Sequence, residues 1–477
     1  MNILIAMDSF KGSIASMQAG DAVKEGILRV DPKANVIVRP LADGGEGTVQ
    51  ALVDGMGGEL VSVRVTGSLG EKVFCEYGIV QLRNTNGIVD EVTDEHMRTA
   101  MPKLSDIVKR QKEYTGDSGY YNGKAEIHKT ELSGELCAVI EIAGAAGLTL
   151  VPEDNRNPMY TTTYGVGEVI RDAIGRGCRR FIIGIGGSAT NDGGVGMLQA
   201  LGVHFFDEED GEIEHGAAGL EKLKLIDTSH MLPELSECEF RIACDVDNPL
   251  CGENGCSAVF APQKGASKED IMKMDKWLSH YAEIVQKLFQ DVMLHKTKKL
   301  SPDMTLHETV KLSPDMMLYK TSKPDENLKS INTDHPGDGA AGGLGFAFRT
   351  FLHGELVSGS RLIIEETGLK DYIEKADIII TGEGCLDGQT VMGKAPISVA
   401  NLAKEYSNAD KPKKVIAFAG KLGDGVKQCL FHGIDAYYAI EYENVVPQDV
   451  MKPEIAGKYL ADTVEKVFRR EGLLDAD

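Results

Sequence analysis

Apolar, strand-like segments alternate with helical patterns along most of this 477-residue chain. The segments 2–7 (NILIAM), 180–186 (RFIIGIG) and 414–420 (KVIAFAG) are almost continuously apolar, as strands that are buried on both faces usually are. Segment 16–30 instead places its apolar residues on one helical face. This alternation of strand and helix predicts an α/β fold with parallel sheets.

The same patterns predict further elements. Strands are expected at 35–40, 137–143, 240–246 and 376–382, a short helix from Thr48, and a long helix over 267–292. Segments 59–65 and 72–80 alternate with period two, which predicts a half-exposed antiparallel pair. The chain is longer than one ordinary core supports, so we expect two domains.

Charge and composition exclude several classes of partner. The formal net charge of −22 would repel nucleic acid and anionic membranes. No apolar run approaches the roughly 20 residues that cross a bilayer, and the N-terminal segment does not resemble a signal peptide. The nine cysteines show neither a C-x-x-C pair nor a zinc-ligand spacing. These features predict a cytoplasmic protein with no nucleic-acid or membrane partner.

Two polar stretches interrupt the α/β pattern. The first spans about 84–134 and contains a pattern for one short helix. The second, 291–326, consists of three tandem twelve-residue copies, DVMLHKTKKLSP, DMTLHETVKLSP and DMMLYKTSKPDE. Twelve residues is not the period of a familiar solenoid, so we interpret the copies as a duplicated surface insertion.

Five loops share one design, in which an apolar strand ends and glycine follows with acidic or hydroxyl residues. They are 7–13 (MDSFKGS), 41–48 (LADGGEGT), 183–194 (IGIGGSATNDGG), 243–252 (ACDVDNPLCG) and 381–395 (TGEGCLDGQTVMGKA). The carboxyl ends of strands line the ligand site of a parallel sheet. The five loops together therefore predict a shared site, although one such loop alone is often only a turn.

Two of the loops resemble known phosphate-binding templates without matching them fully. Gly184, Gly186 and Ala189 fit G-x-G-x-x-A, with Asp207 at a suitable distance, but the loop carries more polar side chains than a dinucleotide needs. The segment GQTVMGKA (388–395) lacks the P-loop hydroxyl. Its lysine either reaches a phosphate or simply opens the following helix.

Together the loops supply the groups that phosphoryl transfer requires, namely cations, amide donors, metal ligands and a base. The candidate cations are Lys11 and Lys394, and the candidate donors are the amides of 44–47 and 186–187. The candidate metal ligands or base are Asp8, Asp43, Asp192, Asp245 and Asp387. Each aspartate, taken singly, also fits an ordinary loop or a helix cap.

The loops, taken as a set, resemble one family. IAMDSFKGS, PLADGGEGT, FIIGIGGSATNDGG, CDVDNPLCG, AVFAPQKGA, GAAGGLGFA and ITGEGCLDGQTVMGKAP closely resemble the bacterial class I glycerate kinases, in family order from Met1 to about Gly425. The resemblance implies phosphorylation of D-glycerate with ATP and Mg²⁺. The expected product is 2-phosphoglycerate, in glyoxylate or sugar-acid degradation.

The resemblance also implies a fold of two α/β domains with the active site in the cleft between them. A flavodoxin-like parallel-sheet domain would comprise 1–68 and 332–477, and an inserted mixed-sheet domain would comprise 69–331. The two polar stretches depart from the family pattern, since they lengthen connections between motifs. They leave the motifs intact.

Residue roles follow as hypotheses. Either Asp192 or Asp43 accepts the proton of the glycerate hydroxyl, while Lys11 and loop amides hold the phosphates. Asp245, Asp8 and Asp387 are the proposed Mg²⁺ ligands. Substrate or phosphate contacts are expected from Gly44, Gly45, Glu46, Gly47, Gly186, Gly187, Ser188, Thr190, Asn191, Glu383 and Lys394. Arg64 and Lys264 are candidates for binding the glycerate carboxylate.

Two other functions stay open on the sequence alone. The G-x-G-x-x-A match would suit a nucleotide-dependent oxidoreductase, and the same scaffold would suit a non-catalytic metabolite-binding regulator. The position that is phosphorylated, the pathway, and whether the chain forms a homodimer are likewise left open.

Overall fold

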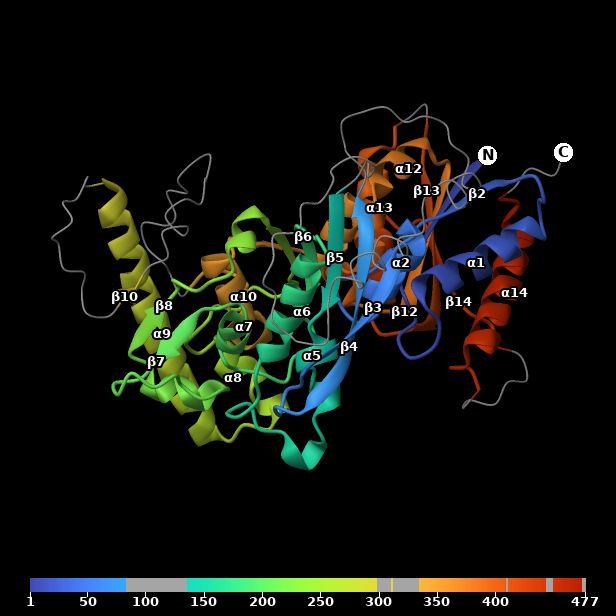
Figure 1. Cartoon of the computed structure of the whole chain (residues 1–477). Coiled ribbons are helices and arrows are strands. Elements are labelled where there is room, and N and C mark those ends of the chain that lie inside the picture. Colours follow the sequence, from blue (N-terminus) through green and yellow to red (C-terminus); the bar gives the residue numbers. More distant parts are fainter. Residues whose placement is uncertain (83–134, 298–309, 312–333, 409–410, 443–448, 474–477) are drawn as a thin grey trace. The chain divides into compact units, whose positions relative to one another are not determined.

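The computed structural model describes residues 1–82, 135–297, 310–311, 334–408, 411–442 and 449–473, and for 290–297 and 310–311 it describes the backbone only. These residues form two compact units, Met1–Gly58 with Val357–Asp477, and Glu59–Leu356 (Figure 1). The sequence suggested boundaries at 68/69 and 331/332, whereas the two units meet at 58/59 and 356/357, so the division differs at both boundaries. It differs because β3 (Glu59–Thr66) pairs along its length with β4 (Lys72–Leu82), and because α10 (Ala340–Phe351) packs in the core of the second unit.

The first unit is built on a five-stranded sheet in the order β14-β13-β12-β1-β2, and every neighbouring pair is parallel. The strands are β1 (Asn2–Met7), β2 (Asn35–Val38), β12 (Ile378–Leu386), β13 (Lys414–Leu422) and β14 (Ala436–Ala439). Counted along the chain, this is the order 2-1-3-4-5 of flavodoxin-like sheets. The expected flavodoxin-like fold is confirmed.

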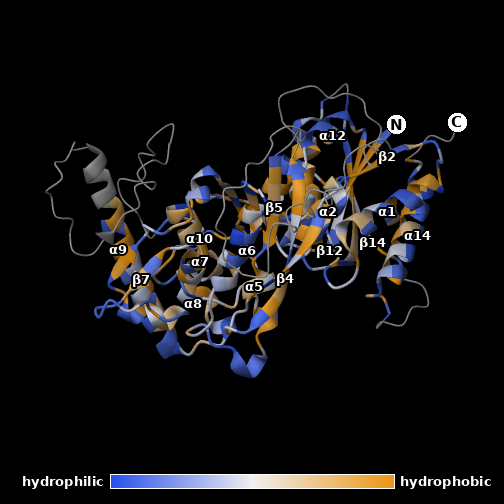
Figure 2. Cartoon of the chain, viewed as in Figure 1, coloured by the Kyte–Doolittle hydropathy of each residue, from blue (hydrophilic) through white to orange (hydrophobic). Residues whose placement is uncertain are grey.

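Helices cover both faces of this sheet. Alternate residues of β1 take part in two separate cores, Ile3 and Ile5 with α1 and α14, and Leu4 and Ala6 with the helices of the other face. Figure 2 shows the apolar residues gathered along the strands. The helices are α1 (Ser16–Leu28), α2 (Thr48–Met56), α11 (Gly359–Glu366), α12 (Leu369–Lys375), α13 (Ala395–Glu405) and α14 (Pro453–Glu471).

The second unit contains a mixed six-stranded sheet in the order β11-β9-β6-β5-β4-β3. Its middle strands β5, β6 and β9 run parallel, whereas β3, β4 and β5 are antiparallel, which confirms the antiparallel pair predicted at 59–65 and 72–80. The further strands are β5 (Glu135–Glu141), β6 (Arg180–Gly184), β9 (Glu239–Ala243) and β11 (Glu355–Val357). A small sheet, β10-β8-β7, comprises β7 (His204–Phe206), β8 (Leu225–Asp227) and β10 (Val310–Lys311).

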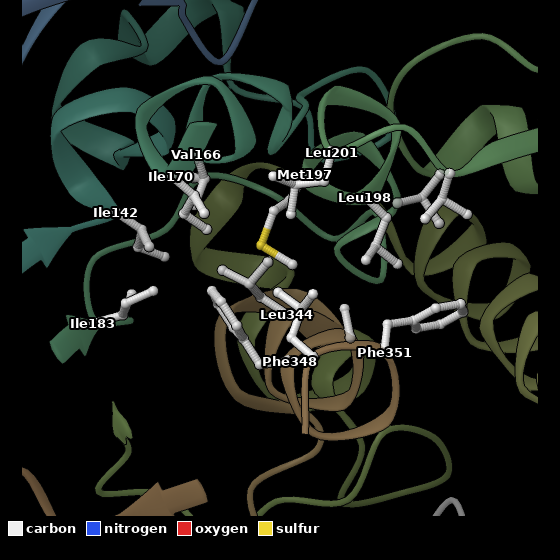
Figure 3. Close-up of a cluster of buried hydrophobic side chains, with 14 of the residues drawn as sticks. Ile142, Val166, Ile170, Ile183, Met197, Leu198, Leu201, Leu344, Phe348 and Phe351 are labelled. Carbon is white, nitrogen blue, oxygen red and sulfur yellow. The ribbon is translucent and has the colours of Figure 1, made fainter. Parts of the chain in front are cut away.

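The helices of the second unit enclose an aliphatic and aromatic core. Met197 and Leu198 pack with Leu344, Phe348 and Phe351 (Figure 3). The helices are α5 (Ala143–Ala146), α6 (Tyr164–Gly175), α7 (Val195–Ala200), α8 (Cys256–Phe260), α9 (Lys268–Thr297) and α10. The bounds of α9 confirm the long helix predicted over 267–292.

Seven short 3-10 turns complete the described structure. They are η1 (Leu148–Leu150), η2 (Glu153–Asn155), η3 (Ala217–Lys222), η4 (Pro233–Glu237), η5 (Pro262–Lys264), η8 (Thr390–Met392) and η9 (Val426–Phe431). Within the described ranges, no helix is both long and apolar enough to cross a bilayer.

The two polar stretches lie largely outside the described residues. The stretch 84–134 with its expected short helix is not described, and of the repeat 291–326 only the end of α9 and β10 are. Val310 of β10 pairs in parallel with Ile226 of β8. The second repeat copy therefore contributes a two-residue strand to the small sheet.

Candidate active site

In the first unit, the predicted residues gather where the strand order reverses. The chain continues from β1 to β2 on one side, and the sheet resumes with β12 on the other side of β1. Ligands of doubly wound sheets bind at the carboxyl ends of the strands at such a switch point. Asp8 follows β1, and Glu383 lies in β12 just beyond Gly382, which pairs with Met7. Sequence and topology thus place two carboxyl groups there.

Asp8 is a buried carboxyl group whose loss of hydration is only partly compensated by hydrogen bonds. Its side chain is 5% exposed, and its Oδ1 accepts a 2.7 Å hydrogen bond from the Ser9 N–H. Burial, with a further contribution from the charge of Asp43, raises the pKa of Asp8 to about 7. A cation bound at Asp8 would favour the ionised form and lower this pKa.

Lys11 and Asp43 form an ion pair beside Asp8. The Lys11 Nζ lies 3.2 Å from the Asp43 Oδ2, and the Asp43 Oδ1 accepts a 2.8 Å hydrogen bond from the Gly45 N–H. Burial alone would lower the pKa of Lys11, but the charges of Asp43, Asp8 and Glu383 outweigh it, so the net shift is upward. Lys11 therefore stays cationic.

The glycine turn 44–47 is shaped by these contacts. Gly44 and Gly47 have φ angles of +83° and +91°, in the left-handed region that favours glycine. A Cβ on Gly45 would lie 2.9 Å from the Asp43 Oδ1. Gly47 precedes α2, and Glu46 is exposed. The turn geometry accounts for the three glycines, and the Gly45 amide is committed to Asp43.

A second group surrounds Glu383. The Thr390 hydroxyl donates a 2.7 Å hydrogen bond to the Glu383 Oε1, and the Lys394 Nζ lies 3.5 Å from Oε2. Burial raises the pKa of Glu383. The Asp387 Oδ1 accepts hydrogen bonds from the backbone N–H groups of Gln389 and Thr390, which stabilises the turn after β12. Lys394 stands immediately before α13, in the strand–loop–helix arrangement of phosphate-binding lysines.

In the second unit, Asp192 is completely enclosed. It is 0% exposed, and its Oδ2 accepts hydrogen bonds from the Thr163 N–H and hydroxyl, both 2.8 Å, and from the Gly196 N–H at 3.3 Å. Its Oδ1 accepts from the Gly194 N–H at 3.2 Å. Burial raises the pKa of Asp192 despite these hydrogen bonds. Asp192 thereby ties its loop to Thr163 and to the first turn of α7.

Lys264 contacts the same loop from η5. Its ammonium group donates to the Ser188 Oγ at 2.8 Å and to the Thr190 carbonyl at 2.7 Å. Burial lowers the pKa of Lys264 to about 8. The sequence suggested Lys264 only as a candidate for the substrate carboxylate. The lysine within the motif AVFAPQKGA was the one signal for its role in the loop.

The loop 186–194 leaves two polar atoms unsatisfied. The Asn191 Nδ2 donates a 2.8 Å hydrogen bond to the Ser257 Oγ, but the Asn191 Oδ1 and the Thr190 Oγ1 are buried without a hydrogen-bond partner. Unpaired buried polar atoms are rare because each costs free energy.

The remaining predicted residues lie on the surface. Gly186 and Gly187 are exposed, with Gly187 at a φ of +73°, and Asp245 is exposed in the loop after β9. Arg64 is exposed on β3. The structure therefore groups Asp8, Lys11, Asp43 and Glu383 in one unit, and Ser188, Thr190, Asn191, Asp192 and Lys264 in the other.

The described carboxylates do not form a ready-made metal cage. In the part of the chain that the structure describes, no group of three or more His, Cys, Asp or Glu residues is placed to hold a metal ion. Mg²⁺ usually binds through one or two carboxylates together with phosphate oxygens and waters. The buried carboxyl of Asp8, beside the charge of Asp43, fits that mode.

The dinucleotide fingerprint lacks its structural context. In that motif the two strands flanking the helix are neighbours in one parallel sheet. Here β6 belongs to the six-stranded sheet and β7 to the three-stranded one. Asp207 accepts hydrogen bonds from the Glu209 and Gly211 amides, which makes it a turn residue.

The flavodoxin-like sheet, with its buried carboxyl groups and lysines at the switch point, is typical of α/β enzymes that act on phosphorylated ligands. A model of the Glycerate kinase family matches residues 3–93 and 103–471. The chain therefore belongs to the glycerate kinase family, whose enzymes are phosphotransferases. The match leaves out only 94–102 of the polar stretch and runs through the repeat.

Individual relatives agree. A protein named glycerate 2-kinase from Escherichia coli is 38% identical over 440 residues, 92% of this chain and 90% of that protein. A glycerate kinase from Halalkalibacterium halodurans is 37% identical over 438 residues, with the same coverage. A crystal structure described as that of a glycerate kinase 2 from Salmonella typhimurium superposes with a TM-score of 0.71 and 34% identity, covering 99% of this chain and 100% of that one.

Proposed function

We propose that the chain transfers the γ-phosphoryl group of ATP to the 2-hydroxyl of D-glycerate, with Mg²⁺, in the degradation of glyoxylate or sugar acids. The observation that carries this proposal is the grouping of Asp8, Lys11 and Asp43 at the switch point of a flavodoxin-like sheet in a member of this family. The name of the Escherichia coli relative supports the choice of the 2-hydroxyl.

The reaction forms one bond and breaks one. The glycerate hydroxyl oxygen attacks the γ-phosphorus, the bond between that phosphorus and the β,γ-bridging oxygen breaks, and ADP leaves. The hydroxyl proton passes to a carboxylate. Because the transition state spreads negative charge over the phosphoryl oxygens, catalysis depends on positioned cations and amide donors.

We assign the phosphates to the first unit. Lys11 and Lys394 supply positive charge, and Lys11 is held by Asp43. Of the glycine turn, the Gly44 and Gly47 amides remain candidates, with Glu46 at its exposed edge. Asp8 would hold Mg²⁺, which when bound neutralises charge on the phosphates. Asp387 and Asp245 stay predicted metal ligands, and Glu383 orients Lys394.

We assign the base to Asp43 rather than to Asp192. A general base must come within hydrogen-bonding distance of the proton that it accepts. The Asp43 side chain is 26% exposed, whereas Asp192 is fully enclosed by four hydrogen bonds. Asp192 is therefore a positioning residue for the loop 186–194.

We assign glycerate recognition to that loop. Ser188, Thr190 and Asn191 stay the predicted substrate-binding residues of this loop; Ser188 is 7% exposed, whereas Thr190 and Asn191 are enclosed in the structure. The exposed amides of Gly186 and Gly187 can donate to a carboxylate.

A coupled ADP-release assay with Mg²⁺ and ATP tests the proposal, with D-glycerate, L-glycerate and tartronate offered separately. We expect ADP formation with D-glycerate, loss of this activity on omission of Mg²⁺, and no comparable rate with the other two acids. A chain that releases no ADP with any of the three acids would contradict the proposal.

A further inference from the structure

We propose that Lys264 is a positioning residue of the phosphoryl-transfer reaction, because its ammonium group fixes the path of the loop 186–194, to which glycerate recognition is assigned. The kinetic part of this inference rests on the proposed function, whereas its structural part does not. It also replaces the sequence-based suggestion that Lys264 binds the glycerate carboxylate.

The contacts of Lys264 point into the protein rather than toward solvent. Its side chain is 3% exposed, and two of its three N–H groups donate to Ser188 and to the backbone of Thr190. A bond to a backbone carbonyl constrains the path of the chain itself, not only a side chain. Lys264 therefore holds the loop at two points that are two residues apart.

The segment that carries Lys264 is itself anchored. Gly265 has a φ of +93°, and a Cβ there would lie 2.1 Å from the Arg156 carbonyl oxygen, so backbone packs on backbone. Earlier in the same segment, Ser257 of α8 accepts the hydrogen bond from Asn191. The segment 256–265 thus hydrogen-bonds to the loop at residues 188, 190 and 191.

Asp192 holds the same loop from its other end. Its four hydrogen bonds fasten the loop to Thr163 and to the first turn of α7. The titratable groups that face Lys264 are Cys256 and Asp192, and burial raises the pKa of the Cys256 thiol to about 12, so this thiol is neutral. Asp192 thus fastens the loop to Thr163 and α7, and Lys264 fastens it to η5.

The chain offers a matched control in Lys413. This lysine is 4% exposed, and its ammonium group donates to the carbonyl oxygens of Glu374 and Ala376 at 2.8 and 2.7 Å. It holds the end of α12 in the first unit and contacts no residue proposed for catalysis or binding. Lys264→Met and Lys413→Met therefore delete the same group, in the same kind of environment, with different expected consequences.

The test combines hydrogen exchange with kinetics on the full chain. In Lys264→Met, we expect the amides of 188–192 to exchange at least about tenfold faster, and kcat with D-glycerate to fall about 100-fold, since misplacement by about 1 Å can cost that much. In Lys413→Met, we expect unchanged exchange in that loop and a kcat within about threefold of the parent. Faster exchange in Lys413→Met should appear only around α12.

Ser188→Ala is the second variant. It removes one acceptor and keeps the ammonium group, so it decides the question where Lys264→Met does not fold. We expect a smaller gain in exchange at 190 and 191, and a double variant that exchanges no faster than Lys264→Met, because the two residues act through one contact.

Each outcome decides one claim. Unchanged exchange of 188–192 in Lys264→Met and Ser188→Ala would overturn the positioning role, as would an equal loss of kcat in Lys264→Met and Lys413→Met. A parent enzyme that exchanges as expected but releases no ADP from ATP and D-glycerate would overturn the proposed function alone.

Discussion

The Lys11 ammonium group lies 3.2 Å from the Asp43 carboxylate, although 32 positions separate the two residues in the chain. They meet because β1 and β2 are parallel neighbours, and each residue follows the carboxyl end of its strand. Asp8 lies within electrostatic range of both. A buried carboxyl, a cation and a candidate base thereby share the switch point of the sheet.

Lys11→Met should remove a cation from the phosphates. We expect kcat to fall about 100-fold, because the positive charge stabilises the transition state more than the ground state. The Lys11 side chain is 56% exposed, so the ion pair contributes little and stability should change little. Steady-state kinetics and thermal unfolding measure both effects. Lys466→Met, which removes an exposed partner of Glu441, is the control and should leave kcat unchanged. Equal kcat values for the two variants would exclude the role of Lys11.

Asp8→Asn should lower activity and raise stability. The folded-state pKa of Asp8 is raised from 3.8 to about 7, so the folded chain binds more protons than the unfolded chain between these values. Stability therefore decreases as pH rises through that window. Asparagine removes the penalty, so we expect a gain of about 2–4 kcal/mol at pH 8 and almost none at pH 4.

Urea unfolding at both pH values measures the gain for Asp8→Asn. Asp21→Asn, an exposed change on α1, should show no such pH dependence. We also expect Asp8→Asn to lose Mg²⁺-dependent turnover. A variant that is destabilised equally at pH 4 and pH 8 would show that the carboxyl of Asp8 is not strained by burial.

Asp43 and Asp192 should respond differently to the same substitution. Asp43→Asn removes the proposed base, so kcat should fall about 10²–10⁴-fold with little change in stability. In Asp192→Asn, an amide N–H must face an N–H donor of the enclosing loop, which should cost about 1–3 kcal/mol. Kinetics and urea unfolding of both variants separate the roles, with exposed Asp154→Asn as control. A larger loss of kcat in a stably folded Asp192→Asn would reverse the assignment.

Ala341→Gly should stabilise the folded chain, whereas Gly342→Ala should destabilise it. Ala341 has a φ of +52°, which costs a non-glycine residue about 1 kcal/mol, so Ala341→Gly should stabilise the chain by up to that amount. A Cβ on Gly342 would lie 2.1 Å from the Thr190 carbonyl oxygen, so Gly342→Ala should destabilise it by more than about 2 kcal/mol. Chemical unfolding measures both, and changes of the same sign would contradict the described turn.

The strands with strong apolar runs could be predicted from the sequence, whereas the three-residue strands could not. β1, β12 and β13 are buried on both faces, and this burial produces their uninterrupted apolar pattern. β7 and β8 have three residues each, too few to show a period. Their stability comes from pairing with residues that are distant in the chain.

The candidate site shows the same limit. The loops could be predicted because glycine and acidic residues follow each strand in one stretch of sequence. The enclosure of Asp192 and the bond from Lys264 to Ser188 could not, since 76 positions separate the latter two and only the fold brings them together. The sequence motifs identified the candidate carboxylates, but they did not show that Asp43 is accessible and Asp192 is enclosed.

Phosphorus-detected NMR of the product from ATP, Mg²⁺ and D-glycerate tests the central claim most directly. The account predicts a new phosphomonoester whose phosphorus couples to the single proton on carbon 2. Coupling to the two protons of carbon 3 would contradict the proposed position, and the absence of any new phosphomonoester would contradict the proposed reaction.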